Sequence, residues 1–166
     1  MAQSDSLPAV KDRLVTPLTI TLRMFRFADM KRFFSVDAQE FRAPMCLDWR
    51  RSEELVKAAN LRGLGVFRLN GRKMSNQAEL FQEFKVKLQF PEYFGANWNA
   101  LDECLADLDW LDRTGYLLVI ESSESLLCDE EMDIREMFDE LLENISEEWA
   151  NSDPPVAYRT ILVAGA

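Results

Sequence analysis

Apolar residues recur along this chain with two different spacings, one typical of strands and one typical of helices. Strands are predicted at residues 45–49, 66–69, 116–120 and 158–163, and the nearly continuous apolar run at 116–120 suits a strand covered on both faces of a sheet. Amphipathic helices are indicated by apolar residues three and four positions apart, over residues 53–60, 77–88, 98–108 and 130–148. Because strands and helices alternate, the sequence predicts an α/β fold, a small and mainly parallel sheet with helices packed on it.

Polar residues mark the predicted starts of three of these helices. Ser52 is placed to cap the first helix, and Asn76, with Glu79 three residues later, resembles a capping box at the start of the second. Asn97 is placed to cap the third helix. Gly95, just before it, permits a backbone conformation that would strain other residues.

The last and longest helix is predicted to bury one face and to expose an acidic one. Its inward side chains are predicted to be Ile134, Met137, Phe138, Leu141, Ile145 and Trp149. Its outward side chains are predicted to be Glu136, Glu140, Glu143 and Glu147. The proline-containing segment 151–155 then separates this helix from the last strand.

The first 43 residues differ in pattern from the rest of the chain. Residues 18–25 alternate as in a half-buried strand, and residues 26–43 mix phenylalanines with lysine and arginine. We therefore predict a β-rich N-terminal extension over residues 1–43, packed on a main domain over residues 44–166 or on a second copy of it in a homo-oligomer. Contact with nucleic acid or a membrane is the alternative, but cations this sparse rarely suffice to bind phosphates.

Charge is distributed unevenly along the chain, whose formal net charge is −10. Residues 1–63 contain 11 basic and 8 acidic side chains, whereas residues 64–166 contain 8 basic and 21 acidic ones. The two parts therefore carry net charges of +3 and −13. An acidic half of this kind repels nucleic acid and attracts a basic protein.

The absence of histidine narrows the chemistry open to the chain. It removes Ser-His and Cys-His nucleophilic pairs, the commonest general base and the usual zinc and iron ligand sets, so no cofactor is expected. Cys46, Cys104 and Cys128 are widely spaced, which argues against a disulfide framework and fits a reducing compartment. Because no secretion signal and no apolar stretch of membrane-spanning length is present, the sequence predicts a cytoplasmic protein.

The most informative stretch is 91–111, where a turn containing proline and glycine leads into the third helix. One helical stripe, predicted to be buried, consists of Trp98, Leu101, Leu105 and Leu108. The other side carries Asn99, Asp102, Glu103 and Asp107. Acidic helix faces are usually ordinary solvated surface, and these carboxylates lack both the cleft of a catalytic pair and the spacing of a calcium loop. A hydrolase that uses them is therefore a minor alternative.

Residues 90–105 also carry a longer motif. Its positions are filled by Phe90, Pro91, Tyr93, Phe94, Gly95, Asn97, Trp98, Ala100, Leu101, Cys104 and Leu105. With these residues in register, the stretch resembles the barstar family of ribonuclease inhibitors. Residues 63–71 and 107–121 resemble the longer bacterial members of that family.

The resemblance implies a barstar-like fold and a protein, not an enzyme itself, that inhibits a basic ribonuclease such as a toxin. In the family, the motif helix and the loop before it plug the nuclease active site, and a carboxylate takes the place of an RNA phosphate. Glu103 matches this carboxylate, and Tyr93 matches an aromatic residue that packs against the enzyme. Gly95 and Asn97 match the turn that presents backbone groups to the partner, and Glu140 matches a second acidic contact.

Two positions depart from the family pattern. Asn99 stands where an aspartate is common, and Asp102 stands where the prototype has an interfacial tryptophan. These departures keep open the alternative of a barstar-fold interaction or adaptor module that no longer inhibits a nuclease. The predicted partner-binding residues are Tyr93, Gly95, Asn97, Asn99, Asp102, Glu103, Asp107 and Glu140.

Overall fold

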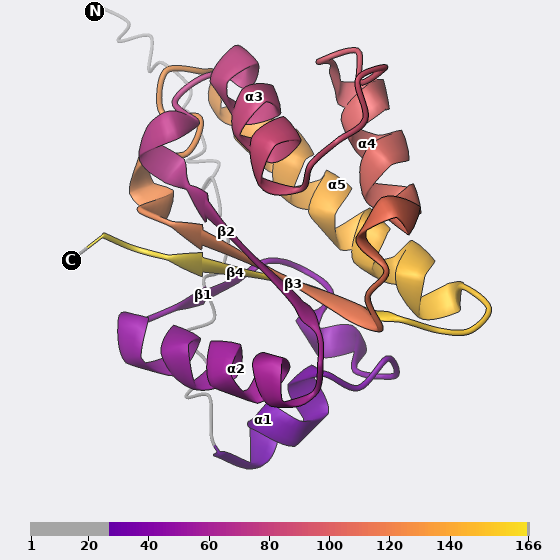
Figure 1. Ribbon diagram of the computed structural model, residues 1–166. Coiled ribbons are helices and arrows are strands. Elements are labelled where there is room, and N and C mark those ends of the chain that lie inside the picture. Colours follow the sequence, from indigo (N-terminus) through magenta and orange to yellow (C-terminus); the bar gives the residue numbers. More distant parts are fainter. Residues whose placement is uncertain (1–26, 166) are drawn as a thin grey trace, which may run out of the picture.

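The computed structural model describes residues 27–165, which form a sheet between two layers of helices (Figure 1). The helices are α1 (Phe27–Phe33), α2 (Trp49–Leu61), α3 (Gln77–Lys87), α4 (Trp98–Asp107) and α5 (Met132–Asn151). The strands are β1 (Met45–Leu47), β2 (Gly65–Asn70), β3 (Gly115–Glu121) and β4 (Ala157–Val163). Short 3-10 helices η1 to η4 cover Gln39–Phe41, Gly71–Lys73, Asp109–Leu111 and Ser123–Ser125. The strand predicted at residues 18–25, and the pairing with a second copy expected of it, lie outside the described residues.

The four strands lie in the order β1, β4, β3, β2, and every neighbouring pair is parallel. β3 and β4 pair along their whole lengths, from Gly115 opposite Ala157 to Glu121 opposite Val163. Both are central strands, and helices cover both of their faces, which explains why all their residues except Glu121 are buried without alternation. The predicted α/β class and parallel sheet are therefore confirmed.

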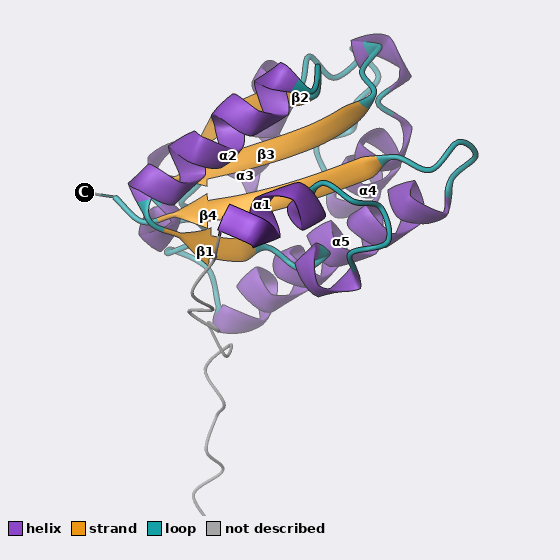
Figure 2. Cartoon of the chain, turned by 90° about the horizontal axis from the view of Figure 1, so that it is seen from below, coloured by secondary structure: helices purple, strands orange, loops and turns teal. Residues whose placement is uncertain are grey.

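Two hydrophobic cores hold the helices to the two faces of the sheet. α3, α4 and α5 cover one face, and α2 with α1 covers the other (Figure 2). Leu118 and Ile120 of β3 belong to the first core, whereas Leu117 and Val119 belong to the second. Successive side chains of a strand point to opposite faces, so β3 contributes to both cores.

The segment from residue 27 to 43 contradicts the prediction of β structure, because it forms α1 and η1. Phe33 and Phe41 are buried in the core on the α2 side of the sheet. Met30 and Phe34 pack against the same core. Phe33 and Phe34 follow Met30 by three and four residues, the spacing that places side chains on one side of a helix. Phe33 and Phe41 are therefore core residues, and they cannot stack on bases or enter a membrane.

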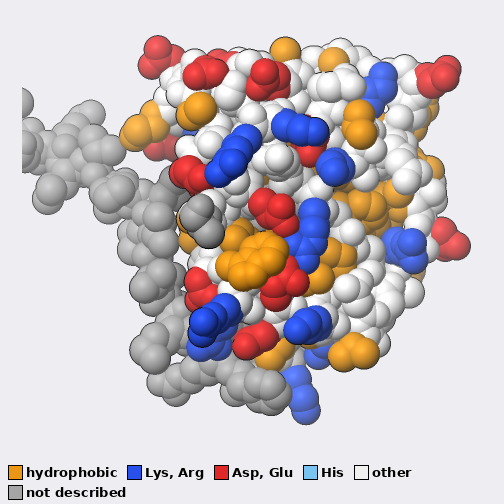
Figure 3. All heavy atoms as spheres, turned by 60° about the vertical axis from the view of Figure 1, so that its left-hand side comes forward, with side chains coloured by type: hydrophobic (Ala, Val, Ile, Leu, Met, Phe, Trp, Pro, Cys, Tyr) orange, Lys and Arg blue, Asp and Glu red, His pale blue; other side chains and the backbone are white. Residues whose placement is uncertain are grey.

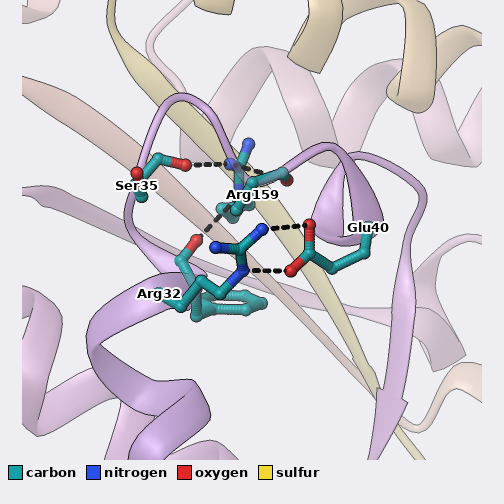
Figure 4. A network of polar contacts seen from close by, with 6 residues as sticks. Arg32, Ser35, Glu40 and Arg159 are labelled. Carbon is teal, nitrogen blue, oxygen red and sulfur yellow. Dashed lines mark hydrogen bonds and ion pairs between the residues drawn. The ribbon is translucent and has the colours of Figure 1, made fainter.

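A buried arginine ties this segment to the sheet (Figure 4). Arg159 of β4 donates from Nε to the carbonyl oxygen of Phe33 at 2.8 Å. Its Nη2 donates to the carbonyl oxygens of Ser35 and Ala38 at 2.7 and 3.4 Å. Its Nη1 donates to Ser146 Oγ at 2.9 Å and to the carbonyl oxygen of the preceding residue at 2.8 Å. All five guanidinium N–H groups thus have acceptors. Burial lowers the pKa of Arg159 to about 10, so the side chain stays charged at neutral pH.

The start of α2 also differs from the prediction. The helix begins at Trp49, because Asp48 Oδ1 accepts a hydrogen bond from the Arg51 backbone N–H at 3.0 Å and caps it there. Ser52, the predicted cap, is buried within the helix, where its hydroxyl donates to the Trp49 carbonyl at 2.7 Å. An earlier cap therefore lengthens α2 by one turn.

Helix α5 buries a slightly different stripe from the predicted one. Phe138, Leu142 and Ile145 are fully buried, whereas Met137, predicted to point inward, is 37% exposed. The predicted outward residues are exposed, namely Glu136, Glu140, Glu143 and Glu147. The helix thus has an acidic outer side that also includes Met137.

Candidate functional site

The loop between α3 and α4 is held by buried aromatic rings on either side of an exposed turn. Phe90 and Phe94 are buried with their ring centroids 4.9 Å apart. The Phe94 backbone N–H donates to the Pro91 carbonyl at 3.0 Å, which closes a turn. Tyr93 lies within this turn and is 76% exposed. The two phenylalanines therefore fix the base of the loop, and the loop presents the Tyr93 ring to solvent.

The turn that leads into α4 is organised by Asn97. Asn97 Oδ1 accepts a hydrogen bond from the Ala100 backbone N–H at 2.9 Å, so Asn97 is the N-cap, as predicted. Its Nδ2 donates to the Gly95 carbonyl at 3.3 Å. The left-handed backbone conformation occurs at Ala96, with φ 49°, and not at Gly95 as expected. Glycine is favoured at position 95 for a different reason, because a Cβ there would lie 2.9 Å from Asn97 Nδ2.

Apolar packing and tryptophan indoles fix the inner side of α4. Leu101 and Leu105 are fully buried. Trp149 of α5 donates from Nε1 to the Leu105 carbonyl at 2.8 Å. At the other end of α4, Trp98 donates from Nε1 to Gln77 Oε1 at 2.7 Å, at the start of α3. α4 is therefore attached to both neighbouring helices, which gives its outer side chains defined positions.

The outer side of α4 carries the polar residues expected there. Asn99, Asp102, Glu103 and Asp107 are all exposed, and we refer to these four residues as the acidic face. Glu140 is exposed on α5, the helix beside α4 (Figure 1). Seven of the eight residues predicted to bind a partner thus lie on α4 and the loop before it, and the eighth lies on the adjacent helix.

Negative charge is concentrated around α4. Residues 91–112 contain six acidic side chains and no lysine or arginine. In the described part of the chain, neither the carboxylates of the acidic face nor that of Glu140 form an ion pair. Burial, with the charges of Asp107 and Glu103, raises the pKa of the Cys104 thiol on the inner side of α4. Because no lysine or arginine within residues 27–165 pairs with these carboxylates, that part of the chain leaves them available to a cationic partner.

The face at the carboxyl ends of the strands, where parallel sheets commonly bind ligands, has a different character. Arg68 bridges Glu53 and Glu121 at 2.6 and 2.7 Å. Its guanidinium carbon lies 5.7 Å from the ring centroid of Trp49, which is 52% exposed. Figure 3 shows basic and acidic side chains side by side around a hydrophobic patch on this side of the molecule. Glu53 and Glu121 on this face thus have a cation partner in Arg68, in contrast to the carboxylates around α4.

Residues 27–165 resemble neither a metal centre nor a membrane-spanning helix. Within them, no group of three or more Cys, Asp or Glu side chains is arranged to hold a metal ion. None of the helices in the same range combines the length and the apolar character needed to cross a membrane. Cys46, Cys104 and Cys128 are all free thiols.

Asn97→Ala is expected to lower the free energy of unfolding by about 1 kcal/mol, because the α4 N-cap is lost. Asn97→Ser, which keeps an acceptor oxygen, is expected to lose less. Urea denaturation followed by circular dichroism measures both. Asn99→Ala is the matched control, since Asn99 is exposed two residues further on, within the first turn of α4, and a loss as large as that of Asn97→Ala would contradict the capping role.

The fold and the site together define a small parallel α/β protein with an exposed helix whose negative charge has no ion-pair partner among the residues that the structure describes. The family model described as Barstar (barnase inhibitor) matches residues 64–160. The Bacillus subtilis (strain 168) protein named "Putative ribonuclease inhibitor YrdF" is 33% identical over 81 residues, which cover 49% of this chain and 89% of that protein. The chain belongs to the barstar family.

The region matched by the family model covers only part of the described structure. It starts at Leu64 and includes β2, β3, α3, α4 and α5, with most of β4. α1, β1 and α2 precede it, although they cover one face and extend one edge of the same sheet. The acidic face and its supporting loop therefore lie wholly within the family region.

Proposed function

We propose that this protein inhibits a basic ribonuclease by occupying the active site of that enzyme with α4 and the preceding loop. The observation that carries the proposal is the group of exposed carboxylates around α4, which have no cation partner within the described residues. Membership of the barstar family and the name of the Bacillus subtilis relative support a ribonuclease as the partner. Inhibition of this kind requires no catalysis by the inhibitor.

Glu103 is the side chain proposed to take the place of an RNA phosphate. It is exposed near the middle of α4, whose inner side is fixed by buried leucines. Ribonuclease active sites bind phosphate with cationic side chains, and a carboxylate placed among them forms charge-assisted hydrogen bonds. Such bonds are roughly twice as strong as neutral ones. The fixed helix also reduces the entropy lost when the carboxylate is immobilised on binding.

The other proposed contacts affect the rates of association with the ribonuclease and of dissociation from it. The excess of negative charge attracts a cationic enzyme and speeds association, an effect that salt weakens. Tyr93, exposed on a fixed loop, provides an aromatic contact, and aromatic contacts of this kind mainly slow dissociation. Glu140 would add a second acidic contact from α5.

Glu103→Ala is expected to weaken inhibition of the cognate ribonuclease by roughly 30-fold or more, which corresponds to about 2 kcal/mol. The measurement is RNA cleavage by the ribonuclease encoded beside this gene, titrated with the full chain at two salt concentrations. Wild-type inhibition should be stoichiometric and weaker at the higher salt concentration. Tyr93→Ala should raise the inhibition constant mainly through a faster dissociation rate.

A matched control for Glu103→Ala is Glu54→Ala. Glu54 is an exposed glutamate on α2, on the other side of the sheet, so its replacement changes net charge equally without touching α4. Equal inhibition by the wild type, Glu103→Ala and Tyr93→Ala would rule out the proposed interface. Failure of the wild type to inhibit any basic ribonuclease would rule out the proposed function.

A second candidate function is an interaction module that does not inhibit a nuclease. The observation that favours it is the pair Asn99 and Asp102, which depart from the family pattern on the acidic face and are both exposed. Neither side chain supports the fold through a hydrogen bond in the described structure, so neither departure has a structural explanation there. Capture of a protein without ribonuclease activity by the full chain, abolished by Glu103→Ala, would favour this function.

The cellular setting belongs to the same proposal. We infer a cytoplasmic inhibitor that protects its producer from a toxic ribonuclease. Free thiols at Cys46, Cys104 and Cys128 are compatible with a reducing compartment.

A further inference from the structure

Strand β2 forms one edge of the sheet and lies in the floor of a groove. The groove has a volume of about 520 Å³, and its lining residues are Val56, Asn60, Val66, Phe67, Arg68 and Lys87. α2 supplies one wall and α3 the other, so the edge of β2 is accessible between two helices (Figure 1). The groove lies apart from α4 and the acidic face, and nothing in the proposed inhibition uses it.

The outer edge of β2 has free backbone groups over the length of this groove. At the end of the strand, the Asn70 backbone N–H donates to Glu83 Oε1 of α3 at 3.1 Å, so this N–H points away from β3. Backbone N–H and C=O groups of alternate residues in a strand point to the same edge. Val66 and Arg68 therefore direct their N–H and C=O groups outward as well, into the groove. A carboxylate closes the edge at Asn70, whereas no residue within 27–165 forms a hydrogen bond to the outward backbone groups of Val66 and Arg68.

Lysine and arginine side chains without an ion pair among the described residues lie around the groove, whereas Arg68 in its lining is neutralised by Glu53 and Glu121. Lys87 lines it and Lys57 is exposed one turn before Asn60 on α2. Arg113 lies against the start of β2, since its Cγ would be 2.9 Å from a Cβ at Gly65. No aspartate or glutamate lines the groove. Its walls end in apolar residues that are largely exposed, namely Leu61 and Val86.

We propose that β2 is a strand-addition site, at which an extended, acidic segment of a second protein pairs with the outer edge of the strand. The free N–H and C=O groups of Val66 and Arg68 would bind the backbone of that segment. Its acidic side chains would lie near Lys87, and its alternate apolar side chains would contact Val56 and Val66. Pairing of β2 with β2 of a second copy is disfavoured, because the same lysines would face each other.

The test is fluorescence anisotropy with the full chain and a fluorescein-labelled hexapeptide of alternating Glu and Val. A hexapeptide of alternating Lys and Val is the charge control and should bind at least roughly 10-fold more weakly. Two further Glu-Val peptides carry N-methyl groups, one on its valines and the other on its glutamates. In strand addition, the N–H groups that face β2 belong either to the valines or to the glutamates, because alternate residues face the same edge. One of these peptides should therefore lose binding, and the other should keep it.

The variants Lys87→Glu and Asn60→Glu, both exposed, are expected to weaken binding of the Glu-Val peptide by roughly 10-fold each. Lys73→Glu is the matched control, because Lys73 lies beyond the closed end of β2 and outside the groove. Glu103→Ala should bind the peptide like the wild type, which separates this site from the proposed inhibitory one. Unchanged binding by Lys87→Glu and Asn60→Glu, or equal affinity of the two N-methylated peptides, overturns the proposal.

Other occupants of the groove give distinguishable results. A wild-type dimer in light scattering that the peptide dissociates would show that a second copy occupies the edge. Peptide binding by a chain that starts at Phe27, but not by the full chain, would show that the first 26 residues occupy it. Either result, or no binding of the Glu-Val peptide at all, overturns the proposal of an acidic partner segment.

Discussion

Arg159→Met is expected to lower the free energy of unfolding by about 3–5 kcal/mol, a large fraction of the stability of a domain of this size. Arg159 is fully buried, and it supplies donors to the carbonyl oxygens of Phe33, Ser35 and Ala38. Methionine fills a similar volume but donates nothing, so several buried carbonyl groups would lose their donor. Each such loss costs about 1–3 kcal/mol, which the removed cost of burying a charge only partly offsets.

Urea denaturation of the full chain measures this effect, with Arg32→Met as the matched control. Arg32 pairs with Glu40 directly beside the Arg159 network, but its side chain is 61% exposed (Figure 4). An exposed ion pair contributes about 0–1 kcal/mol, so the control should be nearly as stable as the wild type. Equal stability of Arg159→Met and Arg32→Met would mean that water can replace the arginine as the donor to these carbonyl groups.

A chain that starts at Pro44 is expected not to fold cooperatively. This truncation removes Phe33 and Phe41 from the core on the α2 side and leaves the Arg159 donors without their carbonyl acceptors. Burying a phenylalanine contributes about 1.5–3 kcal/mol, and an unpaired buried arginine costs several more. The sum is comparable with the whole stability of about 5–15 kcal/mol. We therefore propose that residues 27–43 belong to the folding unit, although the sequence suggested a boundary after residue 43.

The comparison for this experiment is a chain that starts at Phe27, which retains all the described elements. Circular dichroism during urea titration should show a cooperative transition for this chain and a broad, non-cooperative one for the shorter chain. Two cooperative transitions with the same midpoint would show instead that α1 and η1 contribute nothing to the stability of the sheet.

The parts of the fold that could be predicted from the sequence are those set by local signals. The apolar run of β3 specifies a strand covered on both faces, and Asn76 and Asn97 cap α3 and α4 through their own side chains. In α4, the period of 3.6 residues separates buried Leu101 from exposed Glu103, so the exposure of the acidic face could be inferred. These features depend on residues close together in the sequence.

The parts that could not be predicted depend on distant residues. Arg159 occupies an otherwise apolar strand, and it can be buried only because carbonyl groups 121 to 126 positions earlier in the chain accept its hydrogen bonds. The packing of Phe33 on the sheet has the same origin, since the sequence shows no partner for it nearby. At the site, the positive φ falls on Ala96, whereas Gly95 leaves room for the close approach of the Asn97 side chain. The presence of a glycine in the sequence does not show whether it is needed for a positive φ or for the close approach of a neighbouring side chain.

The attachment of α4 has a consequence for how such an inhibitor can evolve. Trp149 donates to the main-chain carbonyl of Leu105, and Trp110 donates to that of Leu88. Any amino acid supplies such an acceptor, and none of the exposed residues of the acidic face takes part in these contacts. Mutations at those positions can therefore accumulate without loosening the helix. As a nuclease diverges, an inhibitor of this kind could adapt to it by substitutions at exposed positions alone. These substitutions would leave the stability of the fold unchanged.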